Sequence, residues 1–355
     1  MSPVGDAPSV VLPNGTFMLG SKFSRQQALL DTKTLTWTLT GAGKKDVNSE
    51  EGWTLLPSGK VLTVDVGLDY WFGLTNKYNS GHGELYDADF GTWSSAGNAG
   101  TQLSAFPDGE IGPAVLMANG MVFVAGAEGT NAIYDSNNNR WYPGPSFPVV
   151  NFNGQPVQLV AQDTGAALLP NGRVLTSANV YGSVNPPVKF FEFDGKNLIP
   201  QPDIPDSAID GYVLLLVLPS GQIMEIDAQT DIEIYTPATE GARPWYTPFD
   251  MEVTRELHPG GTYPLVGRLL NGVSQGAAEG DNAQMATNYP LVRITNIKTH
   301  HVFYSRTHDF SSMAVANPKP ATAWFDVPPG QETGPSLLEV VTNGVACEPI
   351  PVNVE

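Results

Sequence analysis

The 355-residue sequence has a single cysteine, few basic residues and no long apolar segment. The one cysteine, Cys347, excludes an intrachain disulfide and any metal site built from several thiolates. Basic residues number 18 against 36 acidic ones, and the net charge of −18 argues against binding to nucleic acid or to anionic membrane surfaces. The longest notable apolar run, VLLLVL at 213–218, is too short to span a bilayer, so we expect no membrane insertion. This composition allows neutral sugars, cations and basic partners as ligands.

Charged residues make up only 15% of the chain, whereas glycine (37) and proline (30) are abundant. We find no stretch longer than a few residues with the i, i+3, i+4, i+7 apolar spacing of an amphipathic helix. Short apolar segments separated by turn-forming residues are typical of strands. The sequence therefore predicts an all-β protein, and its length favours two domains.

A short motif recurs five times in the first 250 residues. Each copy is an apolar segment, a Pro/Ala-Asn/Ser-Gly turn and a second apolar segment, which together predict a tight β-hairpin. Because the first segment is apolar on both faces, we expect it to be buried on both sides. The turn glycines are Gly15, Gly59, Gly120, Gly172 and Gly221.

A second motif follows each hairpin: an apolar or aromatic residue, an acid, a polar turn and tryptophan. Clear copies are LLDTKTLTW, LYDADFGTW and IYDSNNNRW, which end at Trp37, Trp93 and Trp141. The motif predicts another hairpin, with Asp and Asn as turn residues rather than calcium ligands. Each unit of about 45 residues then has four strands, the size of one propeller blade, and the blades must stack around an axis to bury their faces. We therefore predict a β-propeller with five visible blades over residues 1–250.

The pattern changes after Asp250. Short apolar segments with Gly/Pro turns fill the last hundred residues, as in YPLVRITN (289–296) and SLLEVVTNGVACEPIPVNV (336–354). This pattern predicts an Ig-like β-sandwich over residues 251–355.

The recurring LLPNG-type and YD…W motifs, with PGGTYPLVGRLLNGVSQGA (259–277) and ATNYPLVRITN (286–296), carry a family resemblance. They resemble the kelch-repeat propellers with a C-terminal Ig-like domain, the architecture of galactose oxidase and glyoxal oxidase. The resemblance covers nearly the whole chain. Such proteins usually have about seven blades, so five blades here either close a ring or leave an open edge to cover.

The resemblance does not extend to the copper-radical site. The copper oxidases of this family need a Tyr-Cys cross-link, a second tyrosine and two histidines. Where they carry a Tyr-His pair before a late inner strand, this chain has Tyr212 without a histidine, and the propeller region has no cysteine. These differences argue against a copper-radical oxidase. The first ten residues lack the features of a signal peptide, so the protein is either cytoplasmic or has lost its signal; the resemblance favours a secreted or cell-surface protein.

Acidic residues precede the first strand of every repeat. Because the inner strands of a propeller surround its channel, their carboxylates should meet at one rim. They predict a hard-cation site, with calcium as the ion, or a ring that binds a cationic or polyhydroxyl ligand. The alternative is a hydrated channel mouth whose acids accept hydrogen bonds from backbone N–H groups. The acids are Asp6, Glu50 with Glu51, Glu110, Asp163 and Asp210.

The family resemblance adds His308 to these candidate residues. In the galactose oxidase family a loop of the C-terminal domain carries a Thr-His pair into the propeller channel, where the histidine binds copper. Thr307-His308 matches that pair by local pattern. The match implies that His308 approaches the acidic rim, as a metal ligand or as an acid/base group, although a single histidine is also a common structural residue.

An insertion in the second repeat, between Gly67 and Asp87, is rich in aromatic residues. Sugars are bound by aromatic stacking together with polar contacts, so this insertion predicts a carbohydrate site. The alternative is that its aromatic rings pack against a neighbouring part of the protein. The candidate ligand-binding residues are Tyr70, Trp71, Tyr78 and His82.

Two functions follow from these features. The first is a binding or structural module that recognises a carbohydrate or a protein partner. The second is a carbohydrate-active hydrolase or lyase that uses the acidic rim and His308, with or without a metal. No complete catalytic motif supports the enzyme, because GVSQG (272–276) fits G-x-S-x-G without the helix that a nucleophile elbow needs.

Overall fold

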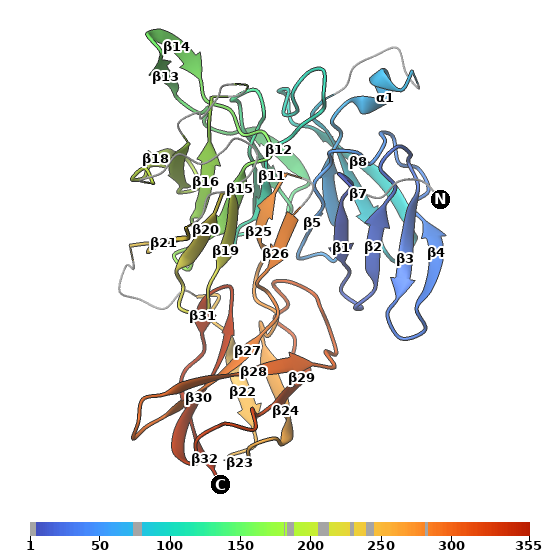
Figure 1. Cartoon of the computed structure of the whole chain (residues 1–355). Coiled ribbons are helices and arrows are strands. Elements are labelled where there is room, and N and C mark those ends of the chain that lie inside the picture. Colours follow the sequence, from blue (N-terminus) through green and yellow to red (C-terminus); the bar gives the residue numbers. More distant parts are fainter. Residues whose placement is uncertain are drawn as a thin grey trace.

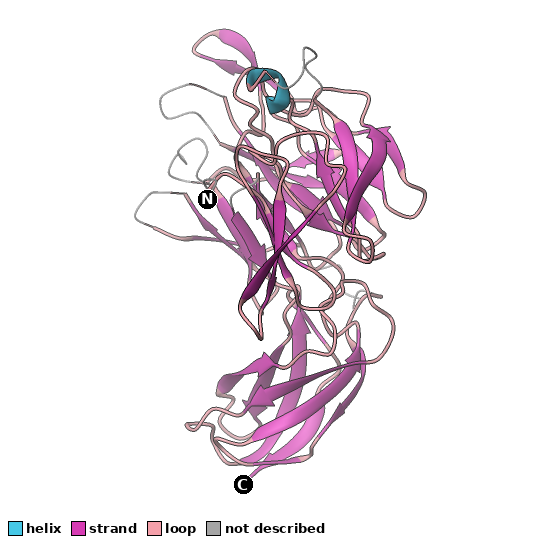
Figure 2. Ribbon diagram, turned by 90° about the vertical axis from the view of Figure 1, so that its right-hand side faces the viewer, coloured by secondary structure: helices cyan, strands magenta, loops and turns pink. Residues whose placement is uncertain are grey.

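The computed structural model describes residues 5–73, 80–180, 182, 188–204, 213–227, 231–238, 245–280 and 283–355. Within these ranges the chain consists of short strands and one helix of four residues, α1 (Leu68–Trp71), which confirms the all-β prediction. The strands form several small antiparallel sheets and one larger curled sheet (Figures 1 and 2). No helix among the described residues is long and apolar enough to cross a membrane.

Five small sheets correspond to the five repeats, and in each the strands pair in chain order. Sheet 1 contains β1 (Ser9–Val11), β2 (Phe17–Gly20), β3 (Gln27–Asp31) and β4 (Thr36–Thr40). Sheet 2 contains β5 (Thr54–Leu55), β6 (Val61–Val64), β7 (His82–Asp87) and β8 (Thr92–Asn98). Sheet 3 contains β9 (Ala114–Leu116), β10 (Met121–Val124), β11 (Ala132–Asp135) and β12 (Arg140–Pro143). A separate hairpin, β13 (Val149–Phe152) and β14 (Gln155–Gln158), follows it.

The remaining repeats give sheets 4 and 5. Sheet 4 contains β15 (Gly165–Leu168), β16 (Val174–Ala178), β17 (Lys189–Phe193) and β18 (Leu198–Pro200), and a hairpin from later in the chain adds two further strands beside β15. Sheet 5 contains β19 (Leu214–Val217), β20 (Ile223–Ile226) and β21 (Glu233–Tyr235). The predicted first hairpin is thus confirmed in all five repeats and the second in the first four, whereas the second hairpin of the fifth repeat falls partly outside the described residues.

Local turn chemistry explains why the repeats fold alike. The five turn glycines all have φ between +82° and +85°, a left-handed conformation that glycine adopts without a steric penalty. The aspartate of the second motif also has a local role, because its Oδ1 accepts a backbone N–H from two residues further along. These N···O distances are 2.8 Å for Asp31, 3.1 Å for Asp87, 2.9 Å for Asp135 and 2.8 Å for Asp194. The predicted turn role of Asp87 and Asp135 is therefore confirmed.

Tryptophans of the second motif join adjacent sheets. Trp93 of sheet 2 donates from Nε1 to Gln27 Oε1 of sheet 1 over 3.3 Å. Trp141 of sheet 3 donates from Nε1 to the carbonyl oxygen of Ala96 in sheet 2 over 3.0 Å. Each of these tryptophans thus links its sheet to the preceding one.

The first strands of the five sheets, β1, β5, β9, β15 and β19, lie side by side in chain order. The turns that follow them face the C-terminal sheet, since the Met313 N–H donates to Pro13 and the Tyr246 hydroxyl to Pro170. The residues that precede these strands therefore lie at the opposite end, on the side of α1 (Figure 1).

A hairpin from the C-terminal part of the chain stands among the inner strands (Figure 1). It consists of β25 (Gly276–Glu279) and β26 (Ala283–Ala286). β25 pairs antiparallel with β15 and also lies against β9 and β19. Gln284 Nε2 donates to the carbonyl oxygen of Trp53 over 2.8 Å, so the hairpin also reaches sheet 2.

The larger sheet curls into a half-barrel near the C-terminus. Its order is β22-β24-β29-β28-β27-β30-β32-β23, with β31 paired to β30. Cys347 is buried beside it. The predicted boundary at Asp250 stays a prediction. The strands are β22 (Phe249–Val253), β23 (Glu256–Leu257), β24 (Thr262–Arg268), β27 (Leu291–Asn296), β28 (Val302–His308), β29 (Ala321–Asp326), β30 (Gly334–Thr342), β31 (Val345–Ala346) and β32 (Ile350–Val354).

Candidate functional site

Four of the predicted acids, Asp6, Glu50, Glu110 and Asp163, come together, and we call them the rim acids. Burial raises the pKa of Glu50 to about 7, and the charges of Glu110 and Asp6 add to this shift. Burial also raises the pKa of Glu110 to about 8, helped by a hydrogen bond to Asp163 and by its charge. The backbone brings Asp163 close to Glu110 as well, because the Asp163 N–H donates to the carbonyl oxygen of Ile111 over 3.4 Å. Asp210, the predicted acid of sheet 5, lies outside the described residues.

Three of the four rim acids share an unusual backbone conformation. Asp6, Glu50 and Asp163 have φ of 43°, 60° and 46°, in the left-handed region that non-glycine residues seldom adopt. Backbone hydrogen bonds tie successive repeats at this level, since the Glu50 N–H donates to Asp6 over 3.1 Å. Unfavourable backbone conformations persist where the surrounding structure fixes them, and they are frequent at functional sites.

Exposed aromatic rings lie beside the rim acids. Lys22 forms ion pairs with Asp6 and, at 3.9 Å, with Glu50, and its Nζ is 5.3 Å from the centre of the Phe23 ring. Phe23 in turn meets Phe72, just after α1, edge to face with the ring centres 5.5 Å apart. Both rings are exposed, by 48% and 44%. Lys22 therefore connects a group of carboxyls to an exposed aromatic pair on one face.

The loop before sheet 3 carries another exposed aromatic ring, four residues before Glu110. Phe106 is 54% exposed and lies in a loop that closes on Glu110, because the Ala105 N–H donates to the Glu110 carbonyl oxygen over 2.7 Å. Neither Phe23 nor Phe106 was a candidate from sequence. Both lie in connecting loops that follow no repeated pattern, so no local signal distinguishes them from other loop residues.

The predicted aromatic site is only partly assembled. Tyr70 is 40% exposed in α1, next to the aromatic pair. His82 does not join it, because this residue begins β7 and its ring nitrogens lie 2.7 Å from Asp65 Oδ2 and 2.9 Å from Ser95 Oγ. Tyr78 and the side chain of Trp71 lie outside the described part of the chain.

Glu51 points away from its neighbour Glu50 into a buried charged cluster. Lys44 Nζ lies 2.7 Å from Glu51 Oε1, 2.6 Å from Glu84 Oε2 and 3.3 Å from Asp65 Oδ1. All four side chains are at most 2% exposed. Asp46 lies beside them. We call these five residues the Lys44 cluster.

The Lys44 cluster has more acids than one ammonium group can neutralise. Burial lowers the pKa of Lys44, but the surrounding carboxylates outweigh this and raise it above its usual value. Burial raises the pKa of Glu84 to about 7 and that of Asp46 to about 6, against the attraction of Lys44. Burial opposes ionisation of Asp65 as well, yet Lys44 and then His82 hold the pKa of Asp65 below its usual value. The surroundings thus favour the charged form of Lys44, while burial disfavours the ionised form of Glu84 and Asp46.

Three acids of this cluster also have the spacing of metal ligands. One carboxylate oxygen each of Asp46, Glu51 and Asp65 lies within 4.8 Å of the other two. Lys44 already contacts two of them, and Asp46 accepts backbone N–H groups from Gly67 and Asp69 over 2.7 and 2.9 Å. A cation at this position would have to displace the lysine, so the cluster fits a structural role better than a metal site. Whether the rim acids bind calcium stays a prediction.

The structure does not bring His308 to the rim acids. His308 ends β28 in the C-terminal sheet, where Nδ1 is 2.8 Å from Asp309 Oδ2 and Nε2 is 3.2 Å from Asp326 Oδ1. The β25–β26 hairpin is the C-terminal segment that approaches the rim. A Cβ placed on Gly280, which follows β25, would lie only 2.8 Å from Asp163 Oδ1.

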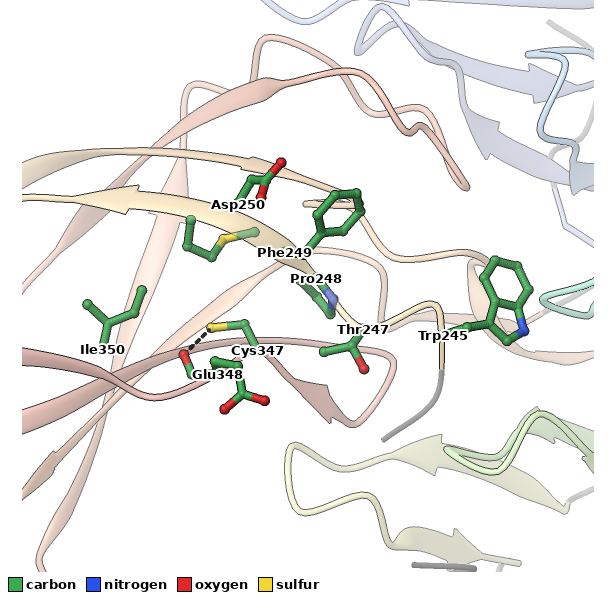
Figure 3. A pocket seen from close by; sticks show the side chains of 9 residues that line it. Trp245, Thr247, Pro248, Phe249, Asp250, Cys347, Glu348 and Ile350 are labelled. Atoms are coloured by element: carbon green, nitrogen blue, oxygen red, sulfur yellow. Dashed lines mark hydrogen bonds between the residues drawn. The ribbon is translucent and has the colours of Figure 1, made fainter. Parts of the chain in front are cut away.

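A second surface feature is an open cleft of about 460 Å³ where the chain enters the C-terminal sheet (Figure 3). Trp245 and Phe249 border it and are 72% and 44% exposed. Asp250, Glu348 and the buried Cys347 also line the cleft. This cleft also combines aromatic rings with carboxylates.

No known protein-family model matches this chain, and no curated protein matches it by sequence. Any function therefore rests on the geometry of the site.

Proposed function

We propose that the five small sheets are blades of a kelch-type β-propeller, and that an Ig-like β-sandwich follows, as in galactose oxidase. The repeated hairpins, the sheet-to-sheet tryptophans and the chain-order arrangement of the inner strands support this architecture. The copper-radical site of that family is not part of the proposal, because Cys347 is the sole cysteine and belongs to the C-terminal sheet region. We further propose a secreted or cell-surface location, which follows from the resemblance alone.

We propose that this protein is a carbohydrate-binding module whose binding face is formed by the rim acids and the neighbouring aromatic rings. The observation that carries the proposal is the contact chain Asp6–Lys22–Phe23–Phe72, which links the rim acids to exposed aromatic rings. Sugars need this combination, because their hydroxyl groups form hydrogen bonds while their C–H faces stack on aromatic rings.

The protonation of the rim acids suits a neutral polyhydroxyl ligand. Raised pKa values of about 7 for Glu50 and about 8 for Glu110 leave protonated carboxyls near neutral pH. A protonated carboxyl both donates and accepts hydrogen bonds, as a sugar hydroxyl does. Lys22 offsets part of the remaining negative charge.

Binding to an array of neutral glycans, followed by titration calorimetry of the hits, tests this function. We expect Glu110→Gln and Phe23→Ala each to weaken binding about tenfold, equivalent to ~1.4 kcal/mol. Trp245→Ala in the cleft is the matched control and should leave affinity unchanged. Each titration is run with calcium and with chelator, so that a calcium bridge at the rim acids is distinguished from direct contact. Glycan binding that depends on Trp245 but not on Glu110 would contradict the proposal, as would binding of basic proteins alone.

One observation favours a second candidate, a carbohydrate-active enzyme. Glu110 has a pKa raised to about 8 by burial and by Asp163, which suits the acid of a glycoside hydrolase, and a rim acid other than its hydrogen-bonded neighbour Asp163 would be the base of the catalytic pair. His308 is not part of this pair. The test is release of product from chromogenic glycosides and from polysaccharides. If the pair is catalytic, Glu110→Gln should lower kcat by about a hundredfold or more with little change in KM. Turnover unaffected by Glu110→Gln would exclude this role.

A further inference from the structure

The solvent-facing side of the C-terminal sheet carries an exposed tryptophan. Residues alternate between buried and exposed along β29, and Ala321, Ala323 and Phe325 point into the core of this sheet. Trp324 comes between them in the sequence, so its ring stands on the opposite side of the strand, where it is 42% exposed. We call the solvent-facing side of β24, β29 and β28 the outer face. The structure describes every residue of these three strands.

The strand register gives Trp324 a fixed set of neighbours. Pro264 of β24 stands opposite it on one side, and His308 of β28 stands opposite it on the other. Asp326 comes two residues later in β29 and therefore lies on the same face. Side chains at opposite positions of paired strands lie within reach of one another, so the indole ring has polar groups beside it.

Asp326 holds the polar groups of the outer face in place. Its Oδ1 accepts a hydrogen bond from the Thr262 hydroxyl over 2.7 Å and lies 3.2 Å from His308 Nε2. Its Oδ2 accepts a hydrogen bond from Arg306 Nη2 over 3.1 Å. The Arg306 side chain is still 78% exposed, so its guanidinium has N–H groups that a ligand can reach. Donors and acceptors that are already fixed lose less conformational entropy when a ligand binds.

A second exposed aromatic ring lies on the outer face. Tyr304 of β28 is 43% exposed and comes four residues before His308, on the same side of the strand. At about 3.3 Å per residue and about 4.8 Å between strands, the backbone positions of Tyr304 and Trp324 are roughly 14 Å apart. Arg306 lies between them along β28. One sugar ring cannot contact both aromatic rings over this span, whereas a chain of several sugars can.

The charge of the outer face favours a neutral ligand. Every basic side chain on the solvent-facing side of these described strands and of the adjacent β27 forms an ion pair with an acid. Glu252, exposed on the neighbouring β22, adds one further acid. An anionic chain would therefore meet no unpaired positive charge here, and the face suits a neutral polyhydroxyl chain. The pairs are Arg306–Asp326, His308–Asp326, His308–Asp309, Arg268–Asp250 and, from β27, Arg293–Glu339.

We propose that the outer face binds a neutral linear oligosaccharide. Trp324 and Tyr304 stack on the C–H faces of two sugar rings in the chain. Arg306 donates and Asp326 accepts hydrogen bonds with hydroxyl groups of the sugars that lie between these two rings. Because both aromatic rings act on one ligand chain, affinity rises with chain length until both are covered.

This site goes beyond the function proposed for the rim acids and does not depend on it. The C-terminal sheet lies at the end of the molecule opposite α1, on whose side the rim acids lie (Figure 1). A short oligosaccharide cannot reach both places, so variants at one site leave the other intact. Glu110→Gln changes only the rim acids, and Trp324→Ala changes only the outer face.

Titration calorimetry of the full chain with soluble linear glucan, mannan and xylan oligosaccharides tests the proposal. The oligosaccharides have about two to six units, and we expect the association constant of the best ligand to rise with its length. Trp324→Ala and Tyr304→Ala should each lower the association constant of the longest ligand about tenfold or more. Trp37→Ala is the matched control, because Trp37 of β4 is a similarly exposed tryptophan, by 48%, on another sheet.

Conservative variants separate stacking on the ligand from a purely structural role. Trp324→Phe and Tyr304→Phe each keep an aromatic ring, so they should retain most of the affinity that the alanine variants lose. Trp324→Phe should in addition remove the change in tryptophan fluorescence that accompanies binding of the oligosaccharide to the wild type.

The remaining outcomes overturn the proposal. They are a wild type that binds none of these neutral oligosaccharides, binding that Trp324→Ala leaves unchanged, and binding of polyuronates or of a protein alone. Oligosaccharide binding that is lost in Glu110→Gln but kept in Trp324→Ala would support the rim acids and overturn the site on the outer face. The reverse result would support the outer face and leave the rim acids without a sugar ligand.

Discussion

Replacement of Lys44 by methionine is the sharpest test of the buried charge in this fold. Methionine retains an unbranched side chain of similar length, but it removes the ammonium group that contacts Glu51, Asp65 and Glu84. Lys44 is fully buried, so water cannot replace it. The acids would then face one another without a counter-charge in a site of low dielectric.

The expected loss follows from this geometry. Removal of one partner from a buried ion pair costs about 3–5 kcal/mol, because the other partner stays buried and unpaired. Lys44 has two close partners at 2.6–2.7 Å, so we expect Lys44→Met to fall in the upper part of that range. A natural domain has only about 5–15 kcal/mol of stability in total. The variant should therefore unfold at a clearly lower denaturant concentration than the wild type.

The loss should also depend on pH. In the wild type the pKa of Glu84 is already raised to about 7 by burial, and removal of Lys44 raises it further. A carboxyl whose folded pKa is raised destabilises the folded state progressively as pH rises above its unfolded pKa of about 4.5. At acidic pH these carboxyls are protonated and no longer repel one another. We therefore expect the loss in free energy of unfolding relative to the wild type to be smaller near about pH 5 than near about pH 8.

Urea unfolding at both pH values measures these differences. Lys60→Met is the matched control, because Lys60 pairs with Asp87 at 3.0 Å but is 41% exposed, and surface pairs contribute about 0–1 kcal/mol. Addition of Glu84→Gln to Lys44→Met should restore part of the lost stability. A Lys44→Met deficit no larger than that of Lys60→Met, or one equal at both pH values, would refute the reasoning.

Three further predictions concern the rim and the contacts between sheets. Wild-type stability should fall as pH rises from about 5 to about 8, because the folded pKa of Glu110 is raised to about 8, and Glu110→Gln should flatten this dependence in thermal melts. Gly280→Ala should lower the melting temperature, since its Cβ would lie 2.8 Å from Asp163 Oδ1; an unchanged melt would show that the hairpin can shift away. Trp141→Phe should cost about 1–3 kcal/mol in urea unfolding, because it leaves the Ala96 carbonyl oxygen without its 3.0 Å donor; a loss similar to that of an exposed substitution would contradict the linking role.

The repeated part of the fold was predictable because its causes are local. A glycine with positive φ closes each inner turn, and an aspartate such as Asp87 holds the outer turn of the first four repeats by accepting a hydrogen bond from a nearby backbone N–H. These signals act over a few residues, so they are visible in the sequence. Asp6, Glu50, Glu110 and Asp163 each stand shortly before an inner strand, and this shared place was the sequence signal for their grouping; Glu51 has the same place but turns into the Lys44 cluster.

Long-range pairing explains what the sequence could not reveal. The β25–β26 hairpin is held by β15 and by Gln284, contacts that join segments more than a hundred residues apart. Its own sequence, GAAEGDNAQMA, has small and polar residues without a strand-like alternation of polarity. The local Thr307-His308 pattern pointed instead to a residue that pairs with Asp326 within the C-terminal sheet.

Glu50 and Glu51 show how closely stability and the proposed site are joined. The left-handed backbone of Glu50, with φ of 60°, sends two adjacent carboxyl groups in different directions. Glu51 is held by Lys44 and by the Thr63 hydroxyl at 3.1 Å, so its position is fixed from inside the protein. Glu50 is thereby held among the rim acids, only 13% exposed, although desolvation and nearby acids make its ionised form unfavourable. The Lys44 cluster thus fixes the backbone next to Glu50 and so stabilises the Glu50 carboxyl in an otherwise unfavourable position.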